Sequence, residues 1–259
     1  MDAVAGSIEL KTPKEIGWMR EAGQIVARTL SLLEASMQPG MSTWDLDQIA
    51  RQELEKSGAK AAFLRYRGYP AVLCVSVNDE VVHGIPRKDK IIREGDIVSL
   101  DFGAVVNGFY GDAAITVGVG AISEKASELM KITETALVKG IAAARHGGRI
   151  GDISNAVQTY AESFGKSVVR EFIGHGIGRR LHEDPAVPNY GPSGQGPRLA
   201  AGMTLAIEPM INDGGSSVRI LEDQWTAVTA DGSLSAHFEH TIVLTESGPE
   251  VLTKRYAEK

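Results

Sequence analysis

The chain has 259 residues, 43% of them hydrophobic, which is enough to bury a large core. Its net charge of −6 argues against a protein that binds nucleic acid over its whole surface, and its single cysteine excludes an intrachain disulfide and indicates a reducing compartment. No apolar run is long enough to cross a membrane, and residues 1–24 lack the apolar core of a signal peptide. We therefore expect a soluble, cytoplasmic protein.

Two helices are expected near the amino terminus. The sequence Thr12-Pro13-Lys14-Glu15 has the spacing of a capping box with proline at the first helical position, and it predicts a helix that runs to about Leu33. A second helix is expected from Ser42-Thr43 to Gly58. A strand-like run over residues 71–77 follows, after several aromatic residues. The chain therefore begins with helices and then turns to strands.

A β-hairpin is predicted next. Its signal is Asn107-Gly108, which favours a type I′ turn because both central residues of that turn need positive φ. A two-residue turn there places Gly103 opposite Asp112 and Asp101 opposite Ala114. Asp101 and Asp112 are then diagonal neighbours on one face of the hairpin, where two carboxylates either repel or share cations.

Two more helices and several short strands are expected in the rest of the chain. The helices should run from about Ser123 to Arg145 and from about Ile150 to Phe164, with Gly147-Gly148 between them. Strand-like segments separated by loops rich in glycine and proline continue to the end of the chain. Helices and strands alternate in blocks, which indicates an α+β protein.

The second half of the chain repeats features of the first. Two blocks match at a common offset of 107 positions (208 − 101): residues 40–58 resemble 147–165, and residues 95–101 resemble 202–208. The second match pairs Asp101 with Glu208. A common offset over two separate blocks is hard to attribute to chance, so we infer two related halves with a site in the crevice between them.

Two further matches pair residues with metal-binding side chains. With an insertion, the segment that starts at Asp112 resembles the segment that starts at Glu239. His83-Gly84-Ile85 resembles His175-Gly176-Ile177. Each half is therefore expected to offer two acidic residues and a histidine to the crevice.

The candidate site consists of Asp101, Asp112, His175, Glu208 and Glu239. Four carboxylates in one cleft would carry about four negative charges, which two divalent cations can neutralise. Oxygen ligands with a single imidazole nitrogen suit Mn, Fe, Co or Zn. The sequence therefore predicts a centre with two divalent metal ions.

Other candidate residues are less informative. His240 follows Glu239 in a strand and should face away from the site, and His237 is expected not to be a ligand. Cys74 lies among apolar strand residues, which favours a packed wall over a nucleophile. The glycine-rich stretches lack the lysine and hydroxyl residue of a phosphate-binding loop, and no serine lies in a G-x-S-x-G turn.

The motifs together resemble those of the type I methionine aminopeptidases, from about Thr12 to Leu252. They are H-G-I-P at His83, L-D-F-G at Asp101, G-D at Asp112, G-H-G-I-G followed by H-E at His175 and His182, I-E-P at Glu208 and F-E-H-T at Glu239. The resemblance implies the pita-bread fold, an α+β fold with two pseudo-twofold-related α/β halves around a central cleft with two metal ions. We expect one domain over residues 1–259, with halves at about 12–120 and 121–252.

The resemblance also implies the reaction and the role of each residue. The reaction is removal of the initiator methionine from new polypeptides when the second residue is small. Asp112 and Glu239 would bridge both ions, Asp101 would complete one site, and His175 and Glu208 would complete the other. Glu208 would take a proton from the activated water that attacks the first peptide bond and pass it to the leaving amine.

The substrate contacts follow from the same resemblance. His83 and His182 match histidines that contact the substrate and assist catalysis. The methionine side chain would be enclosed by Tyr66, Tyr69, Cys74 and Trp225, with Phe63 close by. Leu181 stands where many members carry phenylalanine and His237 where many carry glutamine, departures that bear on the shape of the pocket and not on the reaction.

Two other functions remain open at this point. The first is a pita-bread peptidase for proline-containing peptides, which usually carries a separate amino-terminal domain for which we expect no room in this chain. The second is a non-catalytic module of the same fold that binds proteins or RNA. Such modules lose metal ligands, whereas all five candidate ligands are present here. The expected partners are the N-terminal methionines of peptides and nascent chains. We expect a monomer that does not associate with a membrane. The basic run at residues 87–93 could contact ribosomal RNA transiently or be an ordinary solvated loop.

Overall fold

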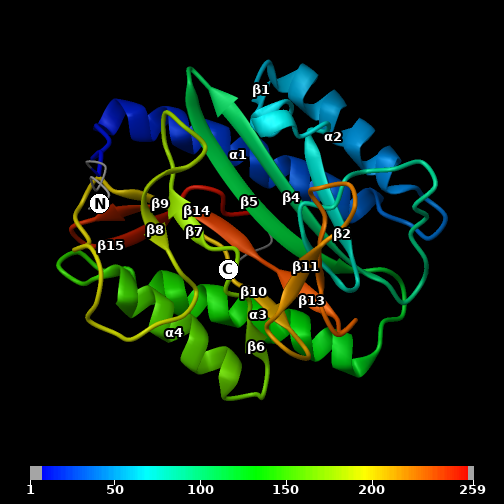
Figure 1. Cartoon of the computed structure of the whole chain (residues 1–259). Helices are drawn as coiled ribbons and strands as arrows, with labels where there is room; N and C mark the ends of the chain where they lie inside the picture. Colours follow the sequence, from blue (N-terminus) through cyan, green and yellow to red (C-terminus); the bar gives the residue numbers. More distant parts are fainter. Residues whose placement is uncertain (1–7, 256–259) are drawn as a thin grey trace.

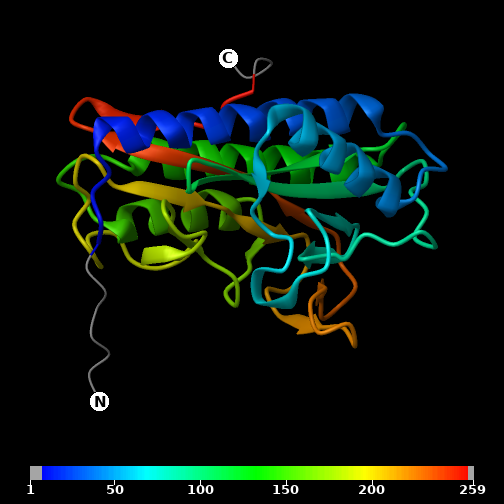
Figure 2. The same cartoon turned by 90° about the horizontal axis from the view of Figure 1, so that it is seen from above.

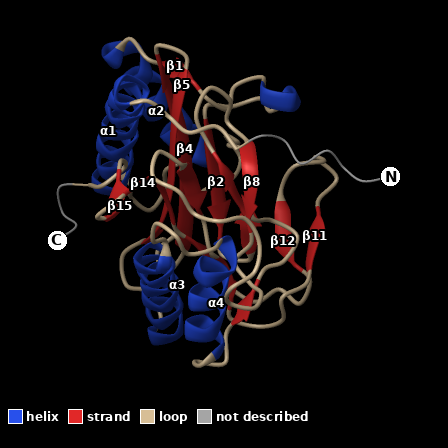
Figure 3. Cartoon of the chain, turned by 90° about the vertical axis from the view of Figure 1, so that its left-hand side faces the viewer, coloured by secondary structure: helices blue, strands red, loops and turns tan. Residues whose placement is uncertain are grey.

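The computed structural model describes residues 8–255, which form a large sheet with helices on one face. The sheet has nine strands in the order β1-β4-β5-β14-β9-β7-β8, with β15 paired to β14 and β2 paired to β4 (Figure 1). All four helices lie on one side of this sheet, and the pair β11–β12 lies on the other (Figure 3). Seen from above, the amino-terminal helices form an outer layer and the orange segment with β11 projects from the opposite side (Figure 2).

The helices are α1 (Pro13–Ser36), α2 (Thr43–Ser57), α3 (Glu124–Ala143) and α4 (Ile150–Glu162), with a 3₁₀ turn at Tyr66–Gly68. The strands of the large sheet are β1 (Lys60–Ala61), β2 (Leu73–Val77), β4 (Ile97–Val106), β5 (Phe109–Gly118), β7 (Gly174–Gly176), β8 (Glu183–Val187), β9 (Thr204–Ile207), β14 (Glu239–Thr245) and β15 (Gly248–Val251). Two small sheets contain β13 (Ser235–His237), β10 (Met210–Asn212) and β6 (Ser167–Val168), and β11 (Val218–Ile220), β12 (Ala227–Thr229) and β3 (Glu80–Val82).

The helix boundaries follow the capping residues of the sequence. Thr12 caps α1, and the Glu15 carboxylate accepts a hydrogen bond from the Thr12 backbone N–H, as predicted from their spacing. The same reciprocal pair, Ser42 with Asp45, begins α2, which ends at Gly58 with φ of +68°. The predicted helices are confirmed, with ends within about three residues of those expected.

The hairpin β4–β5 has the predicted register. Asn107 and Gly108 have φ of +49° and +82°, Asp101 lies opposite Ala114, and Gly103 lies opposite Asp112. Side chains alternate across a strand, so the neighbours of Asp101 in β4 point to the helix-covered face and Asp101 points to the other. The consequence is a sheet with a hydrophobic face and a face that carries charge.

The hydrophobic core lies between the sheet and the helices. Leu100 and Phe102 of β4 are fully buried in one cluster with Leu30 of α1 and Leu129 of α3. Each such side chain contributes about 1.5–3 kcal/mol by leaving water. This core stabilises the strands on the helix-covered face of the sheet, and the candidate site lies on the opposite face.

The sheet has an approximate twofold symmetry, as the sequence repeat suggested. The pair β4–β5 of the first half lies beside the pair β14–β9 of the second, β2 flanks β4, and β7 flanks β9. Helix α1 contacts β4 and β5, and α3 contacts β9 and β14. The pita-bread fold is thereby confirmed. The boundary between the halves, at residues 120 and 121, stays a prediction because one sheet continues across it.

One match of the sequence repeat is wrong. His175 lies on β7, and the counterpart of β7 beside β4 is β2. His83 lies outside β2, directly after β3 in a separate small sheet. The match between H-G-I at residues 83–85 and at residues 175–177 is therefore a local coincidence of sequence and not a symmetric pair.

The structure also bears on membrane insertion. Within residues 8–255, no helix is both long and apolar enough to span a bilayer.

The turn at Asn107-Gly108 generates a prediction on stability. A Cβ at Gly108 would meet no atom within 4 Å, so Gly108→Ala tests the backbone conformation alone. Positive φ should make this variant less stable by about 1 kcal/mol in urea denaturation. Gly17, inside α1, also has open space around its Cβ but no positive φ, so Gly17→Ala is the control and should stabilise by about 0.5–1 kcal/mol. Equal effects of the two variants would contradict the assigned turn.

Candidate metal centre and substrate pocket

Five predicted side chains lie on five adjacent strands of the large sheet. In sheet order they are Asp101 on β4, Asp112 on β5, Glu239 on β14, Glu208 directly after β9, and His175 on β7. The sheet therefore gathers residues that are far apart in the chain. Four carboxylates and one imidazole line one cavity.

Three of these residues are close enough to share an ion. Ligand atoms of Asp112, His175 and Glu239 all lie within 4.8 Å of one another, and all three residues are buried. Glu208 Oε1 lies 3.3 Å from His175 Nε2. Asp101 Oδ1, Asp112 Oδ1 and Glu239 Oε1 are buried without any hydrogen-bond partner.

The tautomer of His175 suits metal binding. Its Nδ1 lies 2.9 Å from the carbonyl oxygen of Gly176, to which it donates, so Nε2 carries the lone pair and faces the carboxylates. Burial, followed by the neighbouring His182, lowers the pKa of His175 to about 3, and the ring therefore stays neutral. A neutral imidazole with a free Nε2 is a nitrogen ligand for a divalent ion.

The carboxylates crowd one another. Burial raises the pKa of Asp112 to about 7. Burial and then the neighbouring Asp112 carboxylate raise the pKa values of Asp101, Glu208 and Glu239 well above their usual range. Protons or cations must therefore offset this charge. Oxygen donors with one imidazole nitrogen fit divalent ions such as Mn, Fe, Co or Zn.

The same cavity, about 410 Å³ in volume, contains every residue that the sequence analysis assigned to the site. Its lining comprises Phe63, Tyr66, Arg67, Tyr69, Cys74, Val82, His83, Asp101, Asp112, Glu171, Phe172, Ile173, His175, Leu181, His182, Glu208, Trp225 and Glu239. The predicted ligands and the predicted aromatic wall thus face one space.

The wall beside the carboxylates is apolar and rigid. Tyr69 and Trp225 meet edge to face with ring centroids 5.1 Å apart, and the Tyr69 hydroxyl lies 3.0 Å from the Gly84 carbonyl oxygen. Burial raises the pKa of the Cys74 thiol well above its usual range, which keeps it protonated. Cys74 therefore lines the cavity as a small, buried, protonated side chain.

The two remaining predicted histidines lie at the cavity with neutral rings. Burial and then His182 lower the pKa of His83 to about 4. Burial and then Arg67 lower the pKa of His182. The Tyr66 hydroxyl lies 2.7 Å from His182 Nδ1, and the rings of His182 and His175 are 4.2 Å apart. Both histidines can therefore exchange hydrogen bonds with a bound molecule without carrying charge.

Several lining residues were not predicted. They are Arg67, Val82, Glu171, Phe172 and Ile173, and they lie in loops or at strand ends. Arg67 has φ of +48°, which is unusual for a residue with a side chain, and its guanidinium lies over the Tyr66 ring at 5.5 Å. Its position next to Tyr66 in the sequence was the only signal that could have identified it.

Two further histidines, His237 and His240, lie outside this lining. His240 lines a different cavity with residues of α3 and β15, so it faces away from Glu239. His237 is fully buried, and burial followed by His83 lowers its pKa to about 3. Neither belongs to the group of possible metal ligands among residues 8–255.

Comparisons with known proteins agree on one family. A model of metallopeptidase family M24 matches residues 17–246. Methionine aminopeptidase 1 of Bacillus subtilis is 52% identical over 244 residues, which cover 94% of this chain and 98% of that relative. The crystal structure of methionine aminopeptidase from Thermotoga maritima matches with a TM-score of 0.95 and 50% identity, over 96% of this chain and 100% of that one. A more distant match is an Xaa-Pro dipeptidase from Bacillus anthracis, with a TM-score of 0.75 and 25% identity over 96% of this chain and 63% of that one.

The raised pKa of Asp112 predicts how stability changes with pH. An acid whose pKa rises from 3.8 to about 7 on folding holds its proton more tightly in the folded state. Its stabilising contribution is therefore complete below about pH 4 and is lost as the pH rises toward about 7. In metal-free protein, urea denaturation should show wild type losing stability relative to Asp112→Asn by on the order of 1 kcal/mol per pH unit across that window.

Asp231 provides a control of the opposite sign. Hydrogen bonds from Ser233 and from the backbone of Gly215 lower the pKa of this exposed carboxyl to about 2. Asp231→Asn should therefore change the pH dependence only below about pH 4. If Asp112→Asn gains no stability relative to wild type as the pH rises, burial does not raise the pKa of Asp112.

Proposed function

Because the chain belongs to metallopeptidase family M24, we propose that its buried carboxylates and histidine hold two divalent metal ions that serve the removal of N-terminal methionine from polypeptides. The activity itself follows from the high identity, over nearly the full length, to methionine aminopeptidases: the chain is a hydrolase that removes N-terminal methionine. The observation that supports the metal centre is the set of buried carboxylate oxygens without hydrogen-bond partners.

We assign Asp101, Asp112, His175, Glu208 and Glu239 as the ligands of the two ions. Ions bound there would lower the pKa of a water molecule and polarise the carbonyl of the scissile bond. The identity of the ions, among Co, Mn, Fe and Zn, is left open by ligands of this type. Asp112 and Glu239 lie on the two central strands of the sheet, which suits them to contact both ions.

Glu208 is the residue to which we assign proton transfer. Its carboxyl group has a raised pKa, and its Oε1 lies 3.3 Å from His175 Nε2. A carboxylate beside the metal centre can take a proton from the attacking water and give it to the leaving amine. The raised pKa belongs to the metal-free site, where burial is its first cause, and bound cations would lower it toward a value suited to a base.

His83 and His182 are assigned to the substrate backbone. With the Tyr66 hydroxyl as donor to Nδ1, the proton of neutral His182 lies on Nε2, from which it can be donated to a carbonyl oxygen of the substrate. The His83 ring is held at right angles to Phe172, 5.3 Å away between centroids. Such neutral, oriented donors stabilise the charge that develops on the carbonyl oxygen.

The apolar wall is assigned to the methionine side chain. Tyr66, Tyr69 and Trp225 provide aromatic faces and edges, and Phe63 and Cys74 complete the wall. An unbranched thioether adapts to such a pocket and makes favourable sulfur–aromatic contacts. The free α-amino group of the substrate can then reach the metal centre at the same cavity, which suits an exopeptidase.

We further propose that the enzyme is a monomer, that it works in the cytoplasm and that its substrates are nascent chains. Ribosome contact through the basic run stays a prediction. Arg87 pairs with Asp89 and Lys90 pairs with Glu80, which reduces the net positive charge that this loop offers to RNA.

The first prediction concerns the metals. Removal of divalent ions with a chelator should abolish hydrolysis of Met-Ala-Ser. The crowded carboxylates would then hold protons in place of the ions, and no ion would activate the attacking water. Addition of Mn, Co or Fe should restore turnover. Full turnover in protein shown to be metal-free by elemental analysis would refute a metal mechanism.

The second prediction concerns the residue after methionine. The rings of Tyr66, His182 and His175 lie side by side, with centroids 5.3 and 4.2 Å apart, and line the cavity that holds the proposed ligands. We infer that they restrict the space for the second residue of the substrate. Peptides with Ala, Gly or Ser in second place should be cleaved at least about tenfold faster than those with Lys or Asp. Equal rates would exclude this selectivity, and rapid cleavage of Ala-Pro with slow cleavage of Met-Ala-Ser would favour a proline peptidase.

The third prediction separates the histidines. His83→Ala and His182→Ala should retain both metal ions and lose about 10²–10³ in kcat, because each removes a donor to the reacting carbonyl. His175→Ala should lose metal affinity, since it removes a ligand. Elemental analysis beside steady-state kinetics distinguishes the cases. A metal ion lost from His83→Ala would make His83 a ligand and overturn the assignment.

A further inference from the structure

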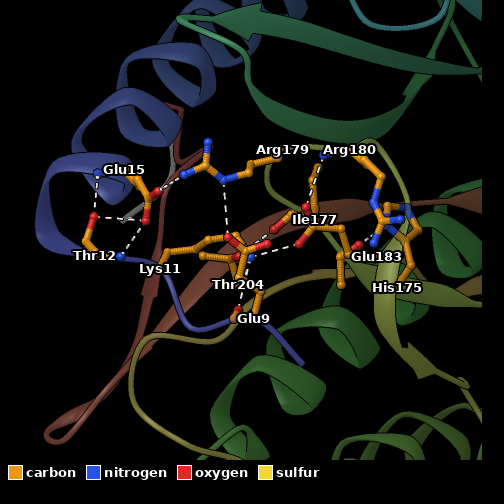
Figure 4. Close-up of polar contacts among 11 residues, drawn as sticks. Glu9, Lys11, Thr12, Glu15, His175, Ile177, Arg179, Arg180, Glu183 and Thr204 are labelled. Atoms are coloured by element: carbon orange, nitrogen blue, oxygen red, sulfur yellow. Dashed lines mark hydrogen bonds and ion pairs between the residues drawn. The ribbon is translucent and has the colours of Figure 1, made fainter. Parts of the chain in front are cut away.

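The segment before α1 sends a lysine into the second half of the molecule. Lys11 Nζ donates to Glu183 Oε2 at 2.8 Å and also to the carbonyl oxygen of Glu9 at 3.0 Å (Figure 4). The Lys11 and Glu183 side chains are only 1% and 4% exposed. Two charges are rarely placed in such a buried position without a compensating geometry, because each loses its hydration.

Glu183 uses its second oxygen to close the loop that carries His182. Its Oε1 accepts the backbone N–H of Arg180 at 3.0 Å, and the N–H of Gly178 donates to the Arg180 carbonyl at 3.1 Å. His182 is the residue directly before Glu183. Hydrogen bonds of Ile177 with Thr204 and of Gly178 with Tyr110 hold the start of the loop over residues 177–183. The Glu183 carboxylate holds its end, next to His182, and Lys11 supplies the counter-charge of that carboxylate.

Lys11 has no room to adopt another position. Its own backbone N–H donates to the carbonyl oxygen of Gly202, just before β9, at 2.8 Å. A Cβ at Gly178 would lie 2.1 Å from Lys11 Cε and 3.0 Å from Glu183 Oε1. The lysine stem is thus enclosed by the loop that it anchors. The ion pair links the amino-terminal segment to the loop 177–183, and the backbone of Lys11 links the same segment to Gly202, just before β9.

The neighbouring charges on the surface are weaker anchors. Arg179 pairs with Glu9 and with Glu15, but its side chain is 55% exposed, so water screens both contacts. The buried pair of Lys11 and Glu183 is therefore the main electrostatic link between the amino-terminal segment and the loop.

We propose that Lys11 is a positioning residue for the aminopeptidase reaction: its buried ion pair with Glu183 holds the loop 177–183 so that His182 faces the substrate cavity. The loop leads from His175 on β7 to His182, whose rings stand 4.2 Å apart. A displacement of the loop would break the contact between His182 Nδ1 and the Tyr66 hydroxyl, now 2.7 Å. The inference rests on the proposed role of His182 at the substrate.

The test compares Lys11→Met with a control variant at Arg20 of α1, close to Lys11 in the chain. Arg20 of α1 also pairs with the second half, at 2.8 Å from Glu250 Oε1, but those side chains are 47% and 44% exposed. Lys11→Met should lose about 10–100-fold in kcat for Met-Ala-Ser with unchanged metal content, because a small misplacement of a catalytic group is costly. Arg20→Met should stay within about twofold. Full kcat in Lys11→Met would overturn the proposal.

A double-mutant cycle shows whether Lys11 acts through His182. In a His182→Ala background, Lys11→Met should cause no further loss of kcat, because the positioned ring is already gone. Additive losses would overturn the positioning role. If His182→Ala alone keeps full turnover, the proposed role of His182 fails and this inference fails with it. If His182→Ala is slow and Lys11→Met is not, only the inference about Lys11 fails.

Loss of folding is handled by a second variant. Lys11→Met leaves the Glu183 carboxylate buried without its counter-charge, which is strongly destabilising, whereas Lys11→Met combined with Glu183→Gln removes both charges. The combined variant should recover thermal stability and yet keep the low kcat, since the amino-terminal anchor of the loop is absent. Recovery of wild-type kcat together with stability would show that the pair contributes only to stability and would overturn the proposal.

Discussion

The burial of four carboxylates in one cavity dominates the energetics of the site, and repulsion among them adds to it. Asp101, Asp112, Glu208 and Glu239 face one cavity, and burial raises the pKa of each. A site of this kind is unfavourable for the isolated chain, because the charges lose hydration and repel one another. Divalent cations convert the same arrangement into a favourable one. The residues that cost stability in the metal-free protein are thus those that we assign to metal binding.

The sheet can hold four carboxylates together because one of its faces packs on the hydrophobic core while the other face lines the cavity. Alternation along β4 sends Leu100 and Phe102 to the helix-covered core and Asp101 to the cavity. This arrangement could be predicted from the sequence, since Asn107-Gly108 determines the turn and the turn determines the register. The repeat of 107 residues likewise indicated the symmetric order of strands, because related halves fold into related strand pairs.

Contacts that depend on irregular loops could not be predicted in this way. The short match between H-G-I at His83 and at His175 suggested a symmetric pair, but the two residues lie on unrelated elements. Arg67 reaches the cavity from a turn with positive φ, which no periodic pattern encodes. Lys11 and Glu183 are 172 positions apart, and neither belongs to the repeat. Their pairing arises from the packing of three segments and appears only in three dimensions.

If cations replace protons on the crowded carboxylates, metal binding must release protons. Calorimetric titration of Mn²⁺ into metal-free protein near pH 6, repeated in buffers that differ in ionisation enthalpy, measures both the number of ions and the protons released. Two ions should bind per chain, and protons should be released as they bind, because burial raises the pKa of Asp112 to about 7. Binding of fewer ions, or binding without proton release, would show that cations do not replace protons in this site.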